Sequence, residues 1–129
     1  REYEEFTVDA FYDEGDLKCL VPRRRLEVRG GEISKGRTEK GPLMDFLVER
    51  LAQLPGARGC LTGQFFAARD WDACEIPVLG VEINPRFGGG YPLTDHVGGH
   101  YVQWLLEKVL FGKQIGYTDD WTSDVTMLR

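Results

Sequence analysis

Residues 6–12 place the strongest constraint on the fold, because apolar side chains occupy every second position there. This is the period of a strand that buries one face. A turn around Gly15 follows, and residues 17–21 are again largely apolar. We therefore expect a β-hairpin that begins a meander. Its second strand should end at Gly30-Gly31, since paired glycines interrupt regular structure.

Further strand patterns occur later in the chain. Residues 60–68 and 77–83 are separated by a polar loop and should form a second hairpin. Residues 32–40 mix charged residues with serine, glycine and threonine, which is typical of either a polar strand or an exposed loop. We expect the apolar tail at residues 125–128 to close the sheet.

The spacing of apolar residues predicts two main helices. Pro42 suits a first helical turn, and apolar residues then recur three or four apart until Pro55-Gly56. A second apolar stripe covers residues 101–110 and ends at Gly112. The predicted class is α+β, with an antiparallel sheet and two main helices packed on one side. The 129 residues fit a single domain, 1–129.

Composition excludes several classes of partner. Sixteen basic and 21 acidic residues give a net charge of -5, which argues against a broad nucleic-acid or anionic-membrane surface. No apolar run is long enough for a membrane span. Cys19, Cys60 and Cys74 are odd in number and outside any metal-ligand spacing, so we expect free thiols and a reducing compartment, the cytoplasm.

Glu82 and Asn84 end an apolar strand pattern and are the first candidates for site chemistry. Residues two apart on a strand share a face, so both side chains should leave one face while Ile83 enters the core. Carboxylate and carboxamide oxygens suit magnesium, and Gln64 could add a third oxygen from the neighbouring strand. The alternative is that Glu82 and Asn84 simply lie on a solvated strand face.

The segment at residues 81–92, Val-Glu-Ile-Asn-Pro-Arg-Phe-Gly-Gly-Gly-Tyr-Pro, closely resembles the metal-binding motif of ATP-grasp enzymes. It is especially similar to the carbamoyl-phosphate-synthase-like members. The stretches at residues 5–9, 21–36 and 63–66 match the same family in order and approximate spacing. The resemblance covers nearly the whole chain, and it implies the carboxyl-terminal subdomain of an ATP-grasp domain, as a fragment of a longer protein.

In that family, ATP phosphorylates a substrate carboxylate, and an amine or similar nucleophile attacks the acyl phosphate. The cofactors implied are ATP and two Mg²⁺ (or Mn²⁺) ions. Carried onto this sequence, the resemblance implies that Gln64 and Glu82 hold one ion and that Glu82 and Asn84 hold the other. The amino-terminal ATP-grasp subdomain, which supplies the other half of the nucleotide cleft, would be a required partner.

Arg86 follows the metal motif and could act as the catalytic residue, because its guanidinium could bind a phosphate or an acyl phosphate. A salt bridge at the rim is the alternative. The glycines at residues 88–90 could offer backbone N-H groups to an oxyanion or could form a flexible turn. Some carbamoyl-phosphate synthases carry a second arginine at the position of Gly89, so bicarbonate is a doubtful substrate.

Nucleotide contacts are implied at three further positions. Glu5 matches an acidic position that lies near the ribose in the family, and an exposed strand carboxylate is the alternative. Arg29, on the same strand face as Arg25, and Lys35 could form a cationic path toward a polyphosphate. A solvated strand face would show the same charges.

Two alternatives to a ligase remain open. The chain could be a non-catalytic nucleotide-binding or interaction module that a partner chain, or a second copy in a homo-oligomer, completes. His96 and His100 are four residues apart, as zinc ligands on a helix are, but Gly98 and Gly99 weaken a helix there and no third ligand is evident. In either case we expect the isolated chain not to hydrolyse ATP.

Overall fold

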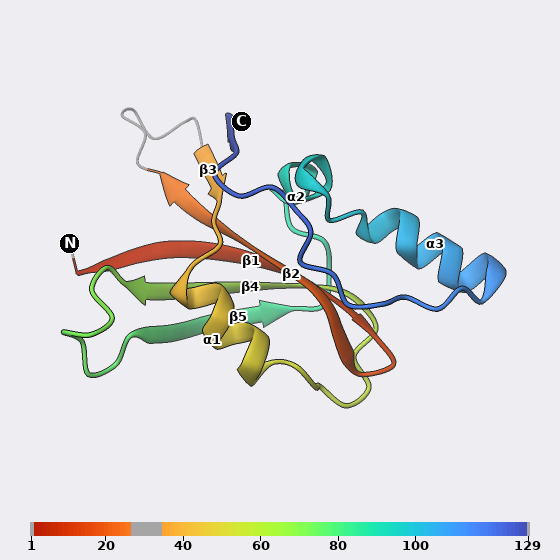
Figure 1. Cartoon of the computed structure of the whole chain (residues 1–129), viewed down its shortest axis with the longest axis horizontal. Coiled ribbons are helices and arrows are strands. Elements are labelled where there is room, and N and C mark those ends of the chain that lie inside the picture. The colour runs from red at the N-terminus through yellow and green to blue at the C-terminus, as the bar shows by residue number, and fades with distance from the viewer. Residues whose placement is uncertain (1, 27–34, 129) are drawn as a thin grey trace.

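The protein forms a six-stranded antiparallel sheet with three helices in a computed structural model, which describes residues 2–26 and 35–128 (Figure 1). The strands lie in the order β5-β4-β1-β2-β3-β6. Their bounds are β1 Tyr3–Asp13, β2 Asp16–Leu26, β3 Lys35–Thr38, β4 Gly59–Ala68, β5 Val78–Asn84 and β6 Thr126–Leu128. The helices are α1 Pro42–Arg50, α2 Tyr91–Val97 and α3 Tyr101–Phe111.

The predicted first hairpin is confirmed: β1 and β2 each have 11 residues, and β1 is longer than the expected residues 6–12. Both central residues of its turn have a positive φ, 51° at Glu14 and 86° at Gly15. This turn geometry matches the twist of the two strands. The turn is also fixed from outside, since Gly15 N-H donates to the Ala57 carbonyl at 2.9 Å and Leu54 N-H donates to the Gly15 carbonyl at 2.8 Å.

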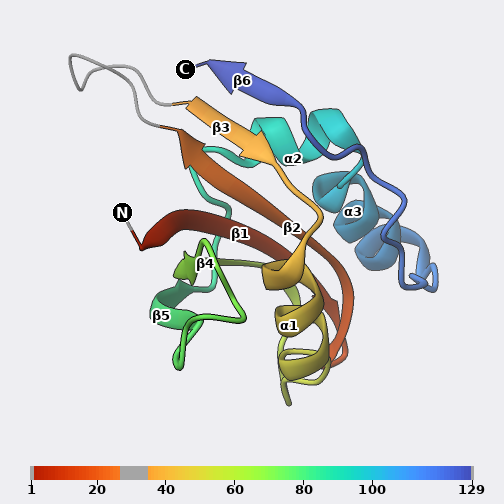
Figure 2. The same ribbon diagram turned by 60° about the vertical axis from the view of Figure 1, so that its left-hand side comes forward.

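The predicted second hairpin, β4 with β5, is also confirmed, and β4 pairs with β1 along its length. The tail closes the other edge of the sheet, where β6 pairs with β3 (Figure 2). The strand alternative for residues 32–40 is therefore right at Lys35–Thr38. The expected break at Gly30-Gly31 lies outside the described residues.

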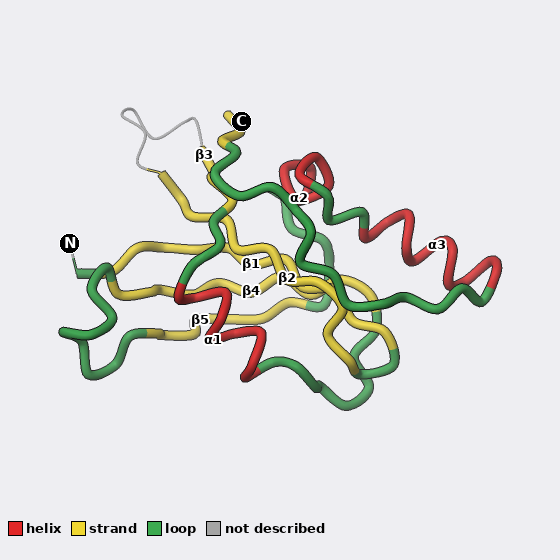
Figure 3. The backbone as a smooth tube through the Cα atoms, viewed as in Figure 1, coloured by secondary structure: helices red, strands yellow, loops and turns green. Residues whose placement is uncertain are grey.

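Both predicted helices form, and a third lies between them in the sequence (Figure 3). Helix α1 starts at Pro42 as predicted but ends at Arg50, because the following backbone pairs with the hairpin: Leu17 N-H donates to the Ala52 carbonyl at 2.9 Å. Helix α3 ends as predicted at Gly112, whose φ of 64° is left-handed. Helix α2 was not anticipated, because its seven residues are too few for apolar periodicity to show.

The α+β class with an antiparallel sheet is confirmed, and the helices cover both faces of the sheet rather than one. Successive residues of β1 point to opposite faces. The Tyr12 hydroxyl donates to the Leu51 carbonyl, directly after α1, at 2.6 Å. The Phe11 ring packs instead on Tyr101 of α3, with ring centroids 5.2 Å apart. Helix α1 therefore covers one face, and α3 covers the other.

Two predictions about burial need correction. The stripe on α3 buries Tyr101, but Val109 and Leu110 are 69% and 66% exposed, because the far half of the helix extends beyond the sheet. Ile83 does not enter the core: it is 49% exposed, since β5 is an edge strand. Among the described residues, no helix has the length and apolar composition needed to cross a membrane.

Candidate functional site

Strand pairing brings the three predicted metal ligands together. Gln64 on β4 lies directly opposite Glu82 on β5, and Asn84 lies one strand period further along, opposite Thr62. Paired residues and residues two apart share a face, so the oxygens of Gln64, Glu82 and Asn84 emerge on the same face. We call this the ligand face, and it is the face that α2 and α3 partly cover.

A row of paired side chains runs across the ligand face, from Glu82 at the edge of the sheet toward the centre of the sheet. Gln64 pairs with Thr7 of β1, and Thr7 pairs with Arg23 of β2. Glu82 is exposed at the edge, Gln64 and Thr7 are half-buried, and Arg23 is buried. The row therefore runs from a solvent-exposed carboxylate to a buried guanidinium.

A cavity of about 310 Å³ opens on the ligand face above this row. Gln64 lines it, whereas Glu82 and Asn84 lie just beyond its lining on the edge strand. Among the described residues, its charged lining has one acidic and five basic members: Glu5, Arg23, Arg24, Arg25, Lys35 and Arg86. Arg23 is paired with Asp9 and Arg24 with Glu39. The other basic residues of the lining supply positive charge, which favours anionic ligands.

The structure places the other predicted site residues as follows. Glu5, Lys35 and Arg86 all line the cavity, as does Arg25. Glu5 Oε2 is 3.5 Å from Nη1 of the exposed Arg25, so part of the local charge is already paired. Arg86 is exposed, and its Nη1 donates to the Phe87 carbonyl at 3.2 Å. The predicted nucleotide contact Arg29 lies outside the described residues.

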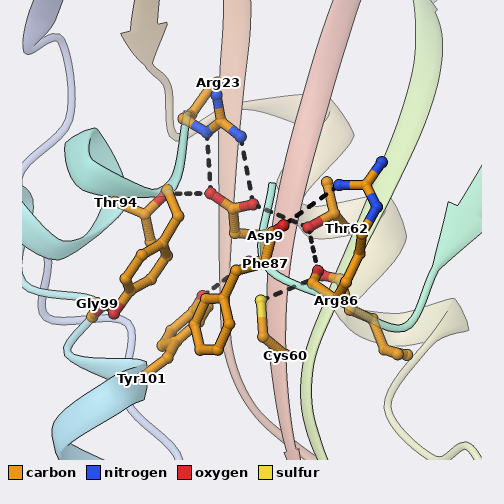
Figure 4. Close-up of polar contacts among 11 residues, drawn as sticks. Asp9, Arg23, Cys60, Thr62, Arg86, Phe87, Thr94, Gly99 and Tyr101 are labelled. Atoms are coloured by element: carbon orange, nitrogen blue, oxygen red, sulfur yellow. Dashed lines mark hydrogen bonds and ion pairs between the residues drawn. The ribbon is translucent and has the colours of Figure 1, made fainter. Parts of the chain in front are cut away.

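Sequence reasoning missed a buried polar network centred on Asp9 (Figure 4). The Asp9 carboxylate is fully buried and accepts two bonds from Arg23, from Nε at 2.9 Å and from Nη2 at 3.2 Å. It also accepts a short hydrogen bond from the Thr94 hydroxyl, and Thr62 Oγ1 lies 3.5 Å from it. Three donors, two from Arg23 and one from Thr94, therefore surround the carboxylate, as a buried charge requires.

This network also fixes the glycine-rich turn. Thr62 Oγ1 donates to the Arg86 carbonyl at 2.7 Å, at the start of the turn. A methyl group at Gly90 would lie 1.8 Å from Arg23 Nη1, and one at Gly88 would lie 2.9 Å from Thr62 Cγ2. The glycines are thus needed for close packing on Arg23 and Thr62, a reason that neither of the two sequence interpretations included.

Burial keeps the thiols of Cys19 and Cys60 and the hydroxyl of Tyr101 in their unreactive, protonated forms. Desolvation raises the pKa of Cys60 to about 12 and the pKa of Cys19 to about 11. It also raises the pKa of Tyr101 well above its usual range. These groups stay protonated at neutral pH, so the chemistry of the ligand face depends on its oxygens and guanidinium groups.

The histidines do not form a metal cluster. His96 lies in α2 and His100 directly precedes α3, with the helix break between them, and His100 Nδ1 lies 3.0 Å from Asp95 Oδ1. Across residues 2–26 and 35–128, no group of three or more His, Cys, Asp or Glu side chains could hold a metal ion. The ligand face offers a different donor set, one carboxylate and two carboxamides.

No protein-family model matches the chain, and no curated protein matches it either.

Proposed function

We propose that the chain is the ATP- and magnesium-binding half of an ATP-grasp type of ligase. The observation that carries the proposal is the pairing of Gln64 with Glu82, with Asn84 on the same face beside the cationic cavity. The resemblance at residues 63–66 and 81–92 implies the same three ligands, and the strand register is compatible with that set. Together they favour a site where metal and phosphates meet.

The residues present fit magnesium. It takes hard oxygen ligands, keeps several waters, and is usually held by one or two carboxylates together with substrate phosphates. Glu82 supplies the carboxylate, and Gln64 and Asn84 supply neutral oxygens. When bound, the metal would neutralise charge on the phosphates. Glu82 would be shared between two ions, because it alone brings a full negative charge.

The cavity suits the phosphates and the reacting carboxylate. Arg86 would bind the transferring group with a charge-assisted fork, and Arg25 and Lys35 would add positive charge along the wall. Phosphoryl transfer needs positioning and charge neutralisation more than covalent help from side chains. The parent enzyme would form an acyl phosphate from a small-molecule carboxylate and pass the acyl group to an amine or similar nucleophile.

The open ligand face supports a second subdomain as the partner. Leu79 on the edge strand β5 is 43% exposed, and its strand partner Phe66 shares the face of Gln64. Exposed apolar groups that border a polar site are typical of a surface covered in the working assembly. In the proposal, the amino-terminal ATP-grasp subdomain covers this surface in the cytoplasm and supplies the rest of the nucleotide cleft.

Manganese broadening of NMR signals tests the metal site. Mn²⁺ added to the ¹⁵N-labelled chain should broaden amide signals at Gln64, Glu82 and Asn84 first. Glu82→Gln should abolish the effect and Asn84→Ala should weaken it, because the carboxylate contributes the charge. Glu49→Gln removes an exposed carboxylate from α1 and is the matched control. Broadening that centres elsewhere, or that survives Glu82→Gln unchanged, would refute the assignment.

A turnover measurement separates the ligase from a binding module that lacks activity. The isolated chain should not hydrolyse ATP, since half of the cleft is supplied by the partner. In the complete parent protein, Glu82→Gln should reduce ATP-dependent ligation more than Asn84→Ala. A parent protein that binds Mn·ATP but shows no turnover would favour the non-catalytic alternative.

A further inference from the structure

Arg23 combines burial with an unused hydrogen-bonding edge. The residue is only 9% exposed, yet it lines the cavity on the ligand face. Nε and Nη2 both donate to Asp9, and Nη1 has no hydrogen-bond partner among the described residues. A guanidinium that binds a carboxylate through Nε and one Nη turns its other edge away from that carboxylate.

Asp9 makes this placement stable without a ligand. A buried cation is costly unless it is paired. The Asp9 carboxylate neutralises Arg23, and the hydroxyl of Thr94 donates a further hydrogen bond to the carboxylate. The guanidinium is therefore fixed in one orientation, and its remaining edge is preorganised.

The glycine turn packs closely on that edge and puts no side chain over it. Position 90 has no room for one, since a methyl group there would lie 1.8 Å from Nη1. Gly90 itself has φ -92° and ψ 5°, which other residues adopt readily. The close approach to Arg23, and not the backbone conformation, is therefore what requires glycine there. Arg86 begins the same turn and lines the same cavity.

We propose that the Nη1 edge of Arg23 and the guanidinium of Arg86 form an oxyanion subsite at the inner wall of the cavity. Its ligand is a carboxylate or phosphate oxygen of the reacting groups, and this assignment rests on the proposed function of the cavity. The Asp9–Arg23 pair is neutral as a whole, so Arg23 contributes a directed hydrogen bond and Arg86 contributes the net charge. Arg23 thus determines where the anion lies.

The test uses small anions without ATP or divalent metal, so that it does not depend on the metal site. Inorganic phosphate and acetate are titrated separately into the ¹⁵N-labelled chain while amide shifts are recorded. Both probes should shift the amides of residues 88–90. Arg23→Lys keeps the charge next to Asp9 but removes the second edge, and Gly90→Ala places a methyl group against Nη1. Each should raise the Kd at least about tenfold, since a hydrogen bond to a charged group is lost.

Gly116→Ala is the matched control, because a methyl group there meets nothing within 4 Å, and its Kd should stay within about twofold of the native value. Thermal unfolding of each variant shows whether the fold is kept.

Response to phosphate alone would support a phosphoryl ligand, and response to acetate alone would support the acceptor carboxylate. Unchanged affinity in both folded variants, or shifts in the native chain centred away from residues 88–90, would overturn the subsite. A chain that binds these anions but fails the manganese test would retain the subsite and lose the metal assignment.

Discussion

Replacing Asp9 with Asn should destabilise the fold more than most single substitutions. The change keeps the size of the side chain but removes the negative charge next to Arg23, which is itself nine-tenths buried. Removing one partner of a buried ion pair typically costs about 3–5 kcal/mol. The carboxamide can still accept one hydrogen bond, so we expect about 3 kcal/mol. For 129 residues the total stability should be about 6–19 kcal/mol, and the loss is a substantial fraction of it.

Urea unfolding followed by tryptophan fluorescence measures this loss. With a slope of about 2 kcal/mol per molar urea, the midpoint should fall by roughly 1.5 M while the slope stays the same. Arg23→Met alone should also destabilise, since it leaves the Asp9 carboxylate buried without its cation. The double variant Asp9→Asn/Arg23→Met should lose clearly less than the two single losses combined. A cost below about 1 kcal/mol for Asp9→Asn, or additive losses, would refute the argument that the pair acts as a unit.

Three further predictions follow from the packing. Burial raises the pKa of Cys60 to about 12 and of Cys19 to about 11, from the usual 9.0, so the folded state favours the neutral thiols. Their contribution to stability is complete below pH 9 and should decline as pH rises toward 11–12. The urea midpoint should therefore be lower at pH 11 than at pH 8.5, and a midpoint that rises would contradict this prediction. Leu47→Ala on α1 should cost about 3 kcal/mol because Leu47 is buried, whereas Leu106→Ala on the exposed side of α3 should cost under about 1 kcal/mol. Equal melting temperatures for the two variants would be inconsistent with this packing. Gly15→Ala should cost about 1 kcal/mol or more, since φ is +86° and the added methyl group would lie 3.3 Å from the Leu54 carbonyl oxygen, while Gly116→Ala should change the urea midpoint little.

Local patterns were sufficient to predict most of the sheet. The alternation at residues 6–12 and the turn at Gly15 predicted the first hairpin, because both signals act within a few residues. The second hairpin, the start of α1 at Pro42 and the end of α3 at Gly112 were predicted for the same reason. The end of α1 was wrong because backbone pairing with a distant turn, and not apolar spacing, ends that helix.

The site residues likewise include some that local sequence patterns predicted and others that depend on distant contacts. Glu82 and Asn84 were found from their spacing, and the register with Gln64 then followed from the hairpin. Asp9 was counted only as a polar position in an alternating strand. Its burial depends on Arg23, 14 residues away, and on Thr94, 85 residues away, and no local pattern links them. A charged residue in the middle of an otherwise apolar strand was the one available signal.

The position of β1 has a consequence for how the chain can be assembled. It is the earliest strand in the sequence but the third of six in the sheet, and it pairs with both β2 and β4. During synthesis, β2 can join it at once, whereas its other edge must wait until β4 emerges more than 40 residues later. The buried carboxylate of Asp9 on β1 acquires its last partner, Thr94, later still. During synthesis the ligand face therefore cannot be completed until α2 has emerged, although Asp9 and Arg23 are present much earlier.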